Sequence, residues 1–150
     1  MRCLSLDVGQ RRIGIAVSDA LGFTAQGLET YTRTDDSKKD LEHIIALAQK
    51  YAPVRLVFGL PRNMDGTYGF QAESVKDFAR ELLSAQYFEH DFQDERLTTV
   101  SAERVLLDAD VSRKKRKQVI DKMAAVIILQ SYLDAGAHNR PPKITVTEAK

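Results

Sequence analysis

Residues 3–17 read CLSLDVGQRRIGIAV, two apolar stretches joined by the polar turn Gly9 to Arg12. Each stretch has the length and the apolar, partly β-branched composition of a strand. Gly9 can supply the backbone dihedral angles that a tight reversal of the chain requires. Residues 3–17 therefore predict a β-hairpin at the start of the chain, with Asp7 at the end of its first strand.

Working outward from this hairpin, the remaining pattern predicts an α/β fold with a mixed five-stranded sheet. Hairpins come first and strands alternate with helices later, which is typical of three antiparallel strands followed by parallel ones, with helices on both faces. The expected order is βββαβαβαα. The expected elements are strands at 3–7, 13–17, 24–32, 54–58 and 87–92, a helix capped by Asp36 or Ser37, helices around 75–82 and after Thr98 or Thr99, and a last helix over 113–133.

A chain of 150 residues fits one domain, which we place at residues 1–138, with a tail at 139–150 and a short strand at 143–146. The formal net charge is only +1, so composition alone does not indicate a nucleic-acid-binding protein. The charge is unevenly distributed, however, because Arg113 to Lys117 is an unbroken basic run. Any binding of nucleic acid would have to come from such local clusters.

Several functional classes are disfavoured by composition. Cys3 is the only cysteine, so no intrachain disulfide can form. The three histidines show no close ligand spacing, which argues against a zinc site. Asp7 interrupts the first apolar stretch too early for a signal peptide, and no apolar run approaches the roughly 20 residues of a membrane span. We therefore expect a cytoplasmic protein.

Three acidic residues stand out by position. Asp7 closes the first strand, Glu95 lies at the predicted exit of the fifth, and Asp121 sits in a helix that is apolar almost all round. Individually they could be a turn residue, a surface acid and a structural salt bridge. Sites in such sheets form at the carboxyl ends of strands, and carboxylates suit Mg²⁺ or Mn²⁺. Ala124 and Ala125 beside Asp121 would let its helix approach the sheet closely.

Four segments, in order and spanning roughly residues 2–135, resemble the motifs of the YqgF/RuvX family. They are Leu6 to Gly9 with Arg12 to Asp19, Phe58 to Gly66, Asp94 to Thr99, and Asp121 to Ala125 followed by Ile128, Leu129, Tyr132 and Leu133. Gln10 stands where a smaller polar residue or Lys would be expected, which puts close substrate contacts of the hairpin in doubt.

The resemblance implies a ribonuclease H-like fold, related to Holliday-junction resolvases, and a nuclease that matures the 5′ end of pre-16S ribosomal RNA. It also implies that Asp7, Glu95 and Asp121 are the catalytic residues and metal ligands. An acid cluster of this kind supports phosphodiester hydrolysis with two metal ions, Mg²⁺ or Mn²⁺. Pre-rRNA, a ribosomal particle or branched DNA would be the partners.

Basic residues near these acids are candidates for binding substrate phosphates. Lys114 and Lys117 precede Asp121 by seven and four residues, so all three share one helix face. Lys residues near a helix N-terminus oppose the helix dipole, which favours a functional reason for them. The other candidates for flanking phosphates, each of which could equally be an ordinary surface residue, are Arg11, Arg12 and Arg62.

Three alternatives compete with this interpretation. An actin-like ATPase also opens with Asp-x-Gly and a hairpin, but it needs two such domains, and 150 residues leave no room for them. A DNA resolvase with the same three acids would need a two-fold dimer to cut a four-way junction symmetrically. A non-catalytic binding module is disfavoured, because clustered negative charge does not help a passive phosphate binder.

Overall fold

The computed structural model describes residues 1–62, 67–95 and 113–142, and it describes the side chains of these residues except those of Glu95 and residues 113–121. Five strands form one sheet in the order β3-β2-β1-β4-β5. The strands are β1 (Arg2–Val8), β2 (Arg12–Ser18), β3 (Ala25–Thr32), β4 (Val54–Pro61) and β5 (Glu89–Glu95). The helices are α1 (Ser37–Lys50), α2 (Phe70–Ala85), α4 (Arg113–Asp134) and the short 3₁₀ helix η1 (Ala137–Asn139).

The sheet is antiparallel on one side of β1 and parallel on the other. β1 pairs with β2, and β2 with β3, in antiparallel register. β4 pairs in parallel with both β1 and β5. The predicted mixed sheet is therefore confirmed, and the carboxyl ends of β1, β4 and β5 meet at one edge.

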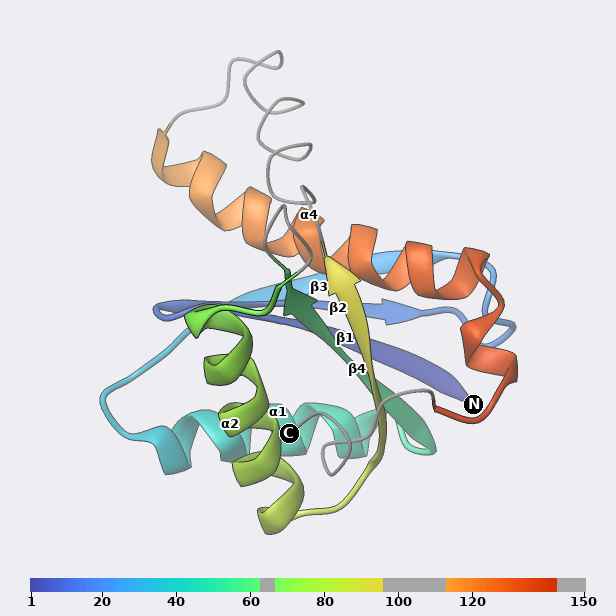
Figure 1. Ribbon diagram of the computed structural model, residues 1–150, viewed down its shortest axis with the longest axis horizontal. Helices are drawn as coiled ribbons and strands as arrows, with labels where there is room; N and C mark the ends of the chain where they lie inside the picture. Colours follow the sequence, from blue (N-terminus) through green and yellow to red (C-terminus); the bar gives the residue numbers. More distant parts are fainter. Residues whose placement is uncertain (63–66, 96–112, 143–150) are drawn as a thin grey trace.

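Alternation along β1 divides its side chains between two cores. Leu4, Leu6 and Val8 pack in the core that includes residues of α1 and α2. Cys3 lies in the second core, under α4, and Ser5 also contacts that helix. Figure 1 shows α1 and α2 on one side of the sheet and α4 on the other, as expected for helices on both faces.

Helix α4 packs closely on the sheet because the residues at the contact are small. Ala124 and Ala125 are buried, and the Ser5 hydroxyl donates a hydrogen bond of 2.6 Å to the Ala125 carbonyl. A Cβ at Gly27 of β3 would lie only 2.7 Å from Lys122 Cγ, so glycine is required there.

The expectation that this helix is buried all round is wrong for the part whose side chains the structure describes. Buried positions recur on one stripe, while Lys122 and Ser131 are exposed. The reason is that the sheet covers a single side of the helix, so the apolar residues outside the stripe are only partly buried.

The β1–β2 turn is held by its own backbone and by Arg33. The Gly9 N–H donates to the Arg12 carbonyl at 2.9 Å, and a Cβ at Gly9 would lie 2.8 Å from that oxygen. Arg33 Nη1 donates to the Gly9 carbonyl at 2.9 Å, and its guanidinium lies 5.3 Å from the ring centroid of Phe78 in α2. The turn beside Asp7 is therefore anchored to the opposite helical layer.

Element boundaries differ from the predicted ones mainly at β5. The predicted strand, residues 87–92, is displaced to Glu89–Glu95, because pairing with β4 continues to Leu60 and Pro61. Asp94 and Glu95 thus belong to the strand rather than to its exit.

The predicted tail begins with ordered packing. Residues 137–139 form η1, and Arg55 Nη1 donates to the Ala137 carbonyl at 3.0 Å. The division between a domain at 1–138 and a tail at 139–150 stays a prediction. The helix predicted after Thr98 or Thr99 and the strand predicted at 143–146 lie outside the described residues. In the described ranges, no helix combines the length and the apolar character needed to cross a membrane.

Candidate active site

The candidate site lies at the edge where the three parallel strands end. Across this edge Leu6 of β1 is level with Phe58 of β4, and Phe58 with Phe92 of β5. Asp7 is the next residue of β1, and Glu95 is the last residue of β5, opposite Pro61. The register therefore brings the backbones of these two acids to the same edge, two strands apart.

Asp7 lies on the α4 face of the sheet, between two glycines. Its side chain alternates with those of Leu6 and Val8, which face the other way, and it is partly buried. Gly14 of β2 is directly opposite Asp7, and Gly59 of β4 follows the residue that is paired with Leu6. Neither neighbour has a side chain beside the carboxylate, which leaves room on both sides for a ligand. Sequence reasoning missed these glycines, although both lie within the quoted motifs.

Helix α4 crosses the sheet so that its N-terminal half approaches this edge. Tyr132 contacts Arg55, which is level with Cys3 in β1, whereas Ala125 contacts Ser5 farther along the same strand. Asp121 lies one helical turn before Ala125, so its backbone continues this progression toward Asp7. In Figure 1 the end of α4 lies near the N-terminus of the chain, and the helix accordingly runs against the direction of β1.

A buried polar network holds the C-terminal half of α4 on β4 and β5. The Tyr132 hydroxyl donates to Asp91 Oδ2 at 2.7 Å and accepts from Arg55 Nη1 at 3.0 Å, while Arg55 Nε donates to Glu89 Oε2 at 3.0 Å. Burial and the hydrogen bond to Asp91 raise the pKa of Tyr132, so the phenol stays protonated as a donor. The sequence alone does not indicate this network, because its members are far apart along the chain. Its effect is to set the position of α4.

The family-model comparison assigns the chain. The model described as "RuvX: Holliday junction resolvase" matches residues 1–135. The chain belongs to the RuvX family. The resemblance that the four sequence motifs indicated is thereby confirmed.

Curated relatives of this RuvX-family chain cover nearly its whole length. One from Halalkalibacterium halodurans is 58% identical over 135 residues, 89% of this chain and 96% of the relative. Another from Symbiobacterium thermophilum is 52% identical over 143 residues, 95% of this chain and 98% of the relative. Both are named "Putative pre-16S rRNA nuclease".

Solved structures of low identity share the fold. The fowlpox virus Holliday junction resolvase aligns with a TM-score of 0.55 at 11% identity, covering 90% of this chain and 99% of the resolvase chain. Thermus thermophilus RuvC, in complex with a Holliday junction substrate, aligns with a TM-score of 0.52 at 15% identity, covering 95% and 99%. The predicted ribonuclease H-like fold is confirmed.

Arg62, predicted to bind substrate phosphates, is held at the same edge of the RuvX-family fold by an ion pair. Its Nη1 donates to Asp94 Oδ2 at 2.9 Å, and the Tyr68 hydroxyl donates to Asp94 Oδ1 at 3.0 Å. The Arg62 guanidinium also lies 5.0 Å from the ring centroid of Tyr68. Asp94 and Tyr68 thus position Arg62 beside Glu95, the next residue of β5.

The other predicted site residues are distributed around this edge. Arg11 is exposed in the β1–β2 turn, and Arg12 is partly buried at the start of β2 with contacts of its own. Lys114 and Lys117 lie in the first turns of α4, and their side chains are outside the described ones.

Metal binding is not tested by the described side chains. Among them no three His, Cys, Asp or Glu residues form a group that could hold a metal ion. The side chains of Glu95 and Asp121 lie outside that set, so whether all three carboxylates meet stays a prediction.

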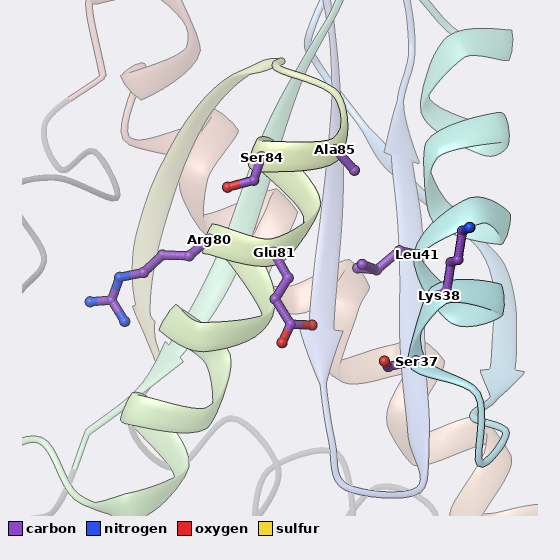
Figure 2. A pocket seen from close by; sticks show the side chains of 7 residues that line it. All are labelled: Ser37, Lys38, Leu41, Arg80, Glu81, Ser84 and Ala85. Atoms are coloured by element: carbon purple, nitrogen blue, oxygen red, sulfur yellow. The ribbon is translucent and has the colours of Figure 1, made fainter.

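Two other features of the RuvX-family chain lie away from these acids. Burial raises the pKa of Cys3 to about 11, so its thiol is not a nucleophile at neutral pH. An open groove of about 540 Å³ runs between the start of α1 and the end of α2. Figure 2 shows Leu41 pointing across it toward α2, while Arg80 extends away from α1. This groove is on the helical layer opposite α4 and does not include Asp7.

Proposed function

We propose that this chain is a metal-dependent nuclease that hydrolyses phosphodiester bonds in the maturation of the 5′ end of pre-16S ribosomal RNA. The observation that carries the proposal is the convergence of three acidic positions, Asp7, Glu95 and Asp121, on one edge of the sheet. The names of the relatives support the substrate, and membership of the RuvX family supports the chemistry. A cytoplasmic location and a ribosomal particle as partner belong to the same proposal.

The distances that the fold allows are compatible with a shared site. β1 and β5 are separated by β4, which places their backbones about 10 Å apart. Position 95 belongs to the same alternate series as Glu89 and Asp91, whose carboxylates contact Arg55 and Tyr132 on the α4 face. Asp7 belongs to that face as well. Carboxylates reaching inward from two such positions could bind ions between them.

The chemistry of the donor set fits Mg²⁺ or Mn²⁺. All three proposed ligands are carboxylates, the hard oxygen donors that these ions prefer, and Gly14 and Gly59 leave space beside Asp7. When bound, two such ions would supply activation of the attacking water and stabilisation of the leaving oxygen. Asp7 is in the central strand of the sheet, so its carboxylate is held in place before substrate arrives.

A cleavage assay on three substrates in parallel tests the proposal. The substrates are a single-stranded RNA carrying the 5′ flank of pre-16S rRNA, a duplex RNA and a four-way DNA junction, each with and without Mg²⁺ or Mn²⁺. We expect metal-dependent cleavage of the single-stranded RNA. Exclusive cleavage of the junction would favour the resolvase alternative, for which a two-fold dimer should be seen in solution. Absence of cleavage on all three would contradict the nuclease assignment.

The basic run at the start of α4 should bind phosphates without reading sequence. Phosphate contacts position a nucleic acid, and each one releases counterions. Replacing Lys114 and Lys117 with Ala should therefore weaken RNA binding. The slope of log affinity against log salt should fall by about 1.4 for two contacts to a single strand. The rate at saturating RNA should change much less.

Filter binding over a salt series measures this slope, and Lys38→Ala with Lys39→Ala, exposed on α1, is the matched control. An unchanged slope would show that Lys114 and Lys117 only solvate the helix start. The phosphate path would then have to run along Arg11, Arg12 and Arg62.

A further inference from the structure

An exposed aromatic ring stands at the same edge of the sheet as the candidate site. Phe70 is the first residue of α2, and 76% of its surface is exposed. Burial of a phenylalanine side chain is normally favourable by about 1.5–3 kcal/mol, so a phenylalanine left in water needs a reason when it lies beside a site. A single exposed apolar residue would by itself mean little.

Contacts of the neighbouring residues locate Phe70. Tyr68, two residues earlier, donates its hydroxyl to Asp94 at 3.0 Å, and Asp94 directly precedes Glu95. The start of α2 is therefore tied to the carboxyl end of β5. The exposed aromatic residues Phe23 and Tyr87 lie elsewhere: Phe23 follows β2, and Tyr87 precedes β5, both at the opposite edge of the sheet.

The surroundings of Phe70 carry positive charge. The Arg62 guanidinium and the Lys76 ammonium lie 5.0 Å and 5.2 Å from the ring centroid of Tyr68. Asp94 and Glu73 pair with these two cations and hold them in place. An exposed ring next to ordered cations is the combination that binds single-stranded nucleic acid, since bases stack on the ring and phosphates approach the cations.

We propose that Phe70 is a stacking platform for a base of single-stranded RNA next to the cleaved phosphate, with Arg62 positioned by Tyr68 and Asp94 beside it. This inference rests on the proposed nuclease function and specifies its substrate as unpaired at the site. Bases inside an A-form duplex are stacked on each other and cannot reach the ring, so duplex RNA gains nothing from Phe70.

Tryptophan fluorescence tests the contact directly, because the chain contains no tryptophan. Phe70→Trp introduces a single reporter at the proposed platform, and Tyr87→Trp introduces one at the other end of β5. Both are titrated with a single-stranded RNA in EDTA, which prevents metal-dependent cleavage, while anisotropy of labelled RNA measures binding separately. We expect saturable quenching for Phe70→Trp and none for Tyr87→Trp.

Alanine variants give the independent energetic test. Phe70→Ala should weaken binding of single-stranded RNA about tenfold and leave binding of blunt duplex RNA unchanged within twofold. Tyr87→Ala, which removes an aromatic residue that is 69% exposed, should change neither. Equal losses for the two alanine variants, or bound RNA without quenching of Phe70→Trp, would overturn the stacking inference and leave the nuclease proposal standing. Failure of the unsubstituted chain to bind RNA at all would overturn both.

Discussion

Asp7→Asn should abolish cleavage while leaving the fold intact. The substitution keeps the shape of the side chain and removes the charge that a bound metal ion needs. Even outer-sphere partners of metal ligands typically contribute about 10- to 100-fold to activity or metal affinity, so loss of a direct ligand should exceed 100-fold. Rates of RNA cleavage at saturating Mg²⁺ measure the effect.

Thermal unfolding supplies a second readout that does not depend on activity. A ligand that binds only the folded state stabilises it, by about 2.7 kcal/mol at a concentration 100 times its Kd. Mg²⁺ should therefore raise the melting temperature of the unsubstituted chain and have much less effect on Asp7→Asn. In metal-free buffer the variant should be at least as stable, because one of three clustered like charges is gone.

Asp77→Asn is the matched control, since Asp77 is an exposed acid of α2 whose carboxylate pairs with Arg80 at 2.9 Å. It should retain both cleavage and the stabilisation by Mg²⁺. Undiminished cleavage by carefully purified Asp7→Asn protein would refute the assignment of Asp7 as a catalytic residue.

Ala125→Leu should destabilise the protein and inactivate it together. Ala125 is fully buried where α4 touches β1, and its carbonyl accepts the 2.6 Å hydrogen bond from Ser5. A larger side chain cannot fit without moving the helix, which costs about 1–3 kcal/mol for overpacking and about 1 kcal/mol for the lost hydrogen bond. The melting temperature should fall by about 6–12 °C.

The loss of activity should be larger than the fraction of unfolded protein explains. A displacement of about 1 Å at a catalytic group can cost about 100-fold in rate, and Asp121 lies one turn from the overpacked position. Circular dichroism melts and cleavage rates measured well below the melting temperature separate the two effects.

Ser131→Leu adds a leucine to an exposed position of the same helix and should change neither quantity appreciably. Full activity of a folded Ala125→Leu protein would mean that the position of α4 does not govern the site. It would then also argue against Asp121 as a metal ligand.

Local pattern in the sequence determined the elements and their order. Alternating apolar residues and Gly9 predicted the β1–β2 hairpin, and Asp36 caps α1 as expected, accepting hydrogen bonds from the backbone N–H groups of Lys38 and Lys39. These features depend on neighbours within a few residues, which is why sequence alone reveals them. The three acidic residues were singled out by position, and the link among them came from the resemblance to the RuvX family.

Only the tertiary structure decided where α4 lies and what surrounds Asp7. The hydrogen bond from Ser5 to Ala125 joins residues 120 positions apart, and the Arg55–Tyr132 contact joins residues 77 positions apart. Gly14 becomes a neighbour of Asp7 through strand pairing. Likewise, helical periodicity could not show that α4 is covered on one side only. Burial is a property of what packs against a helix, so it arises when distant segments meet.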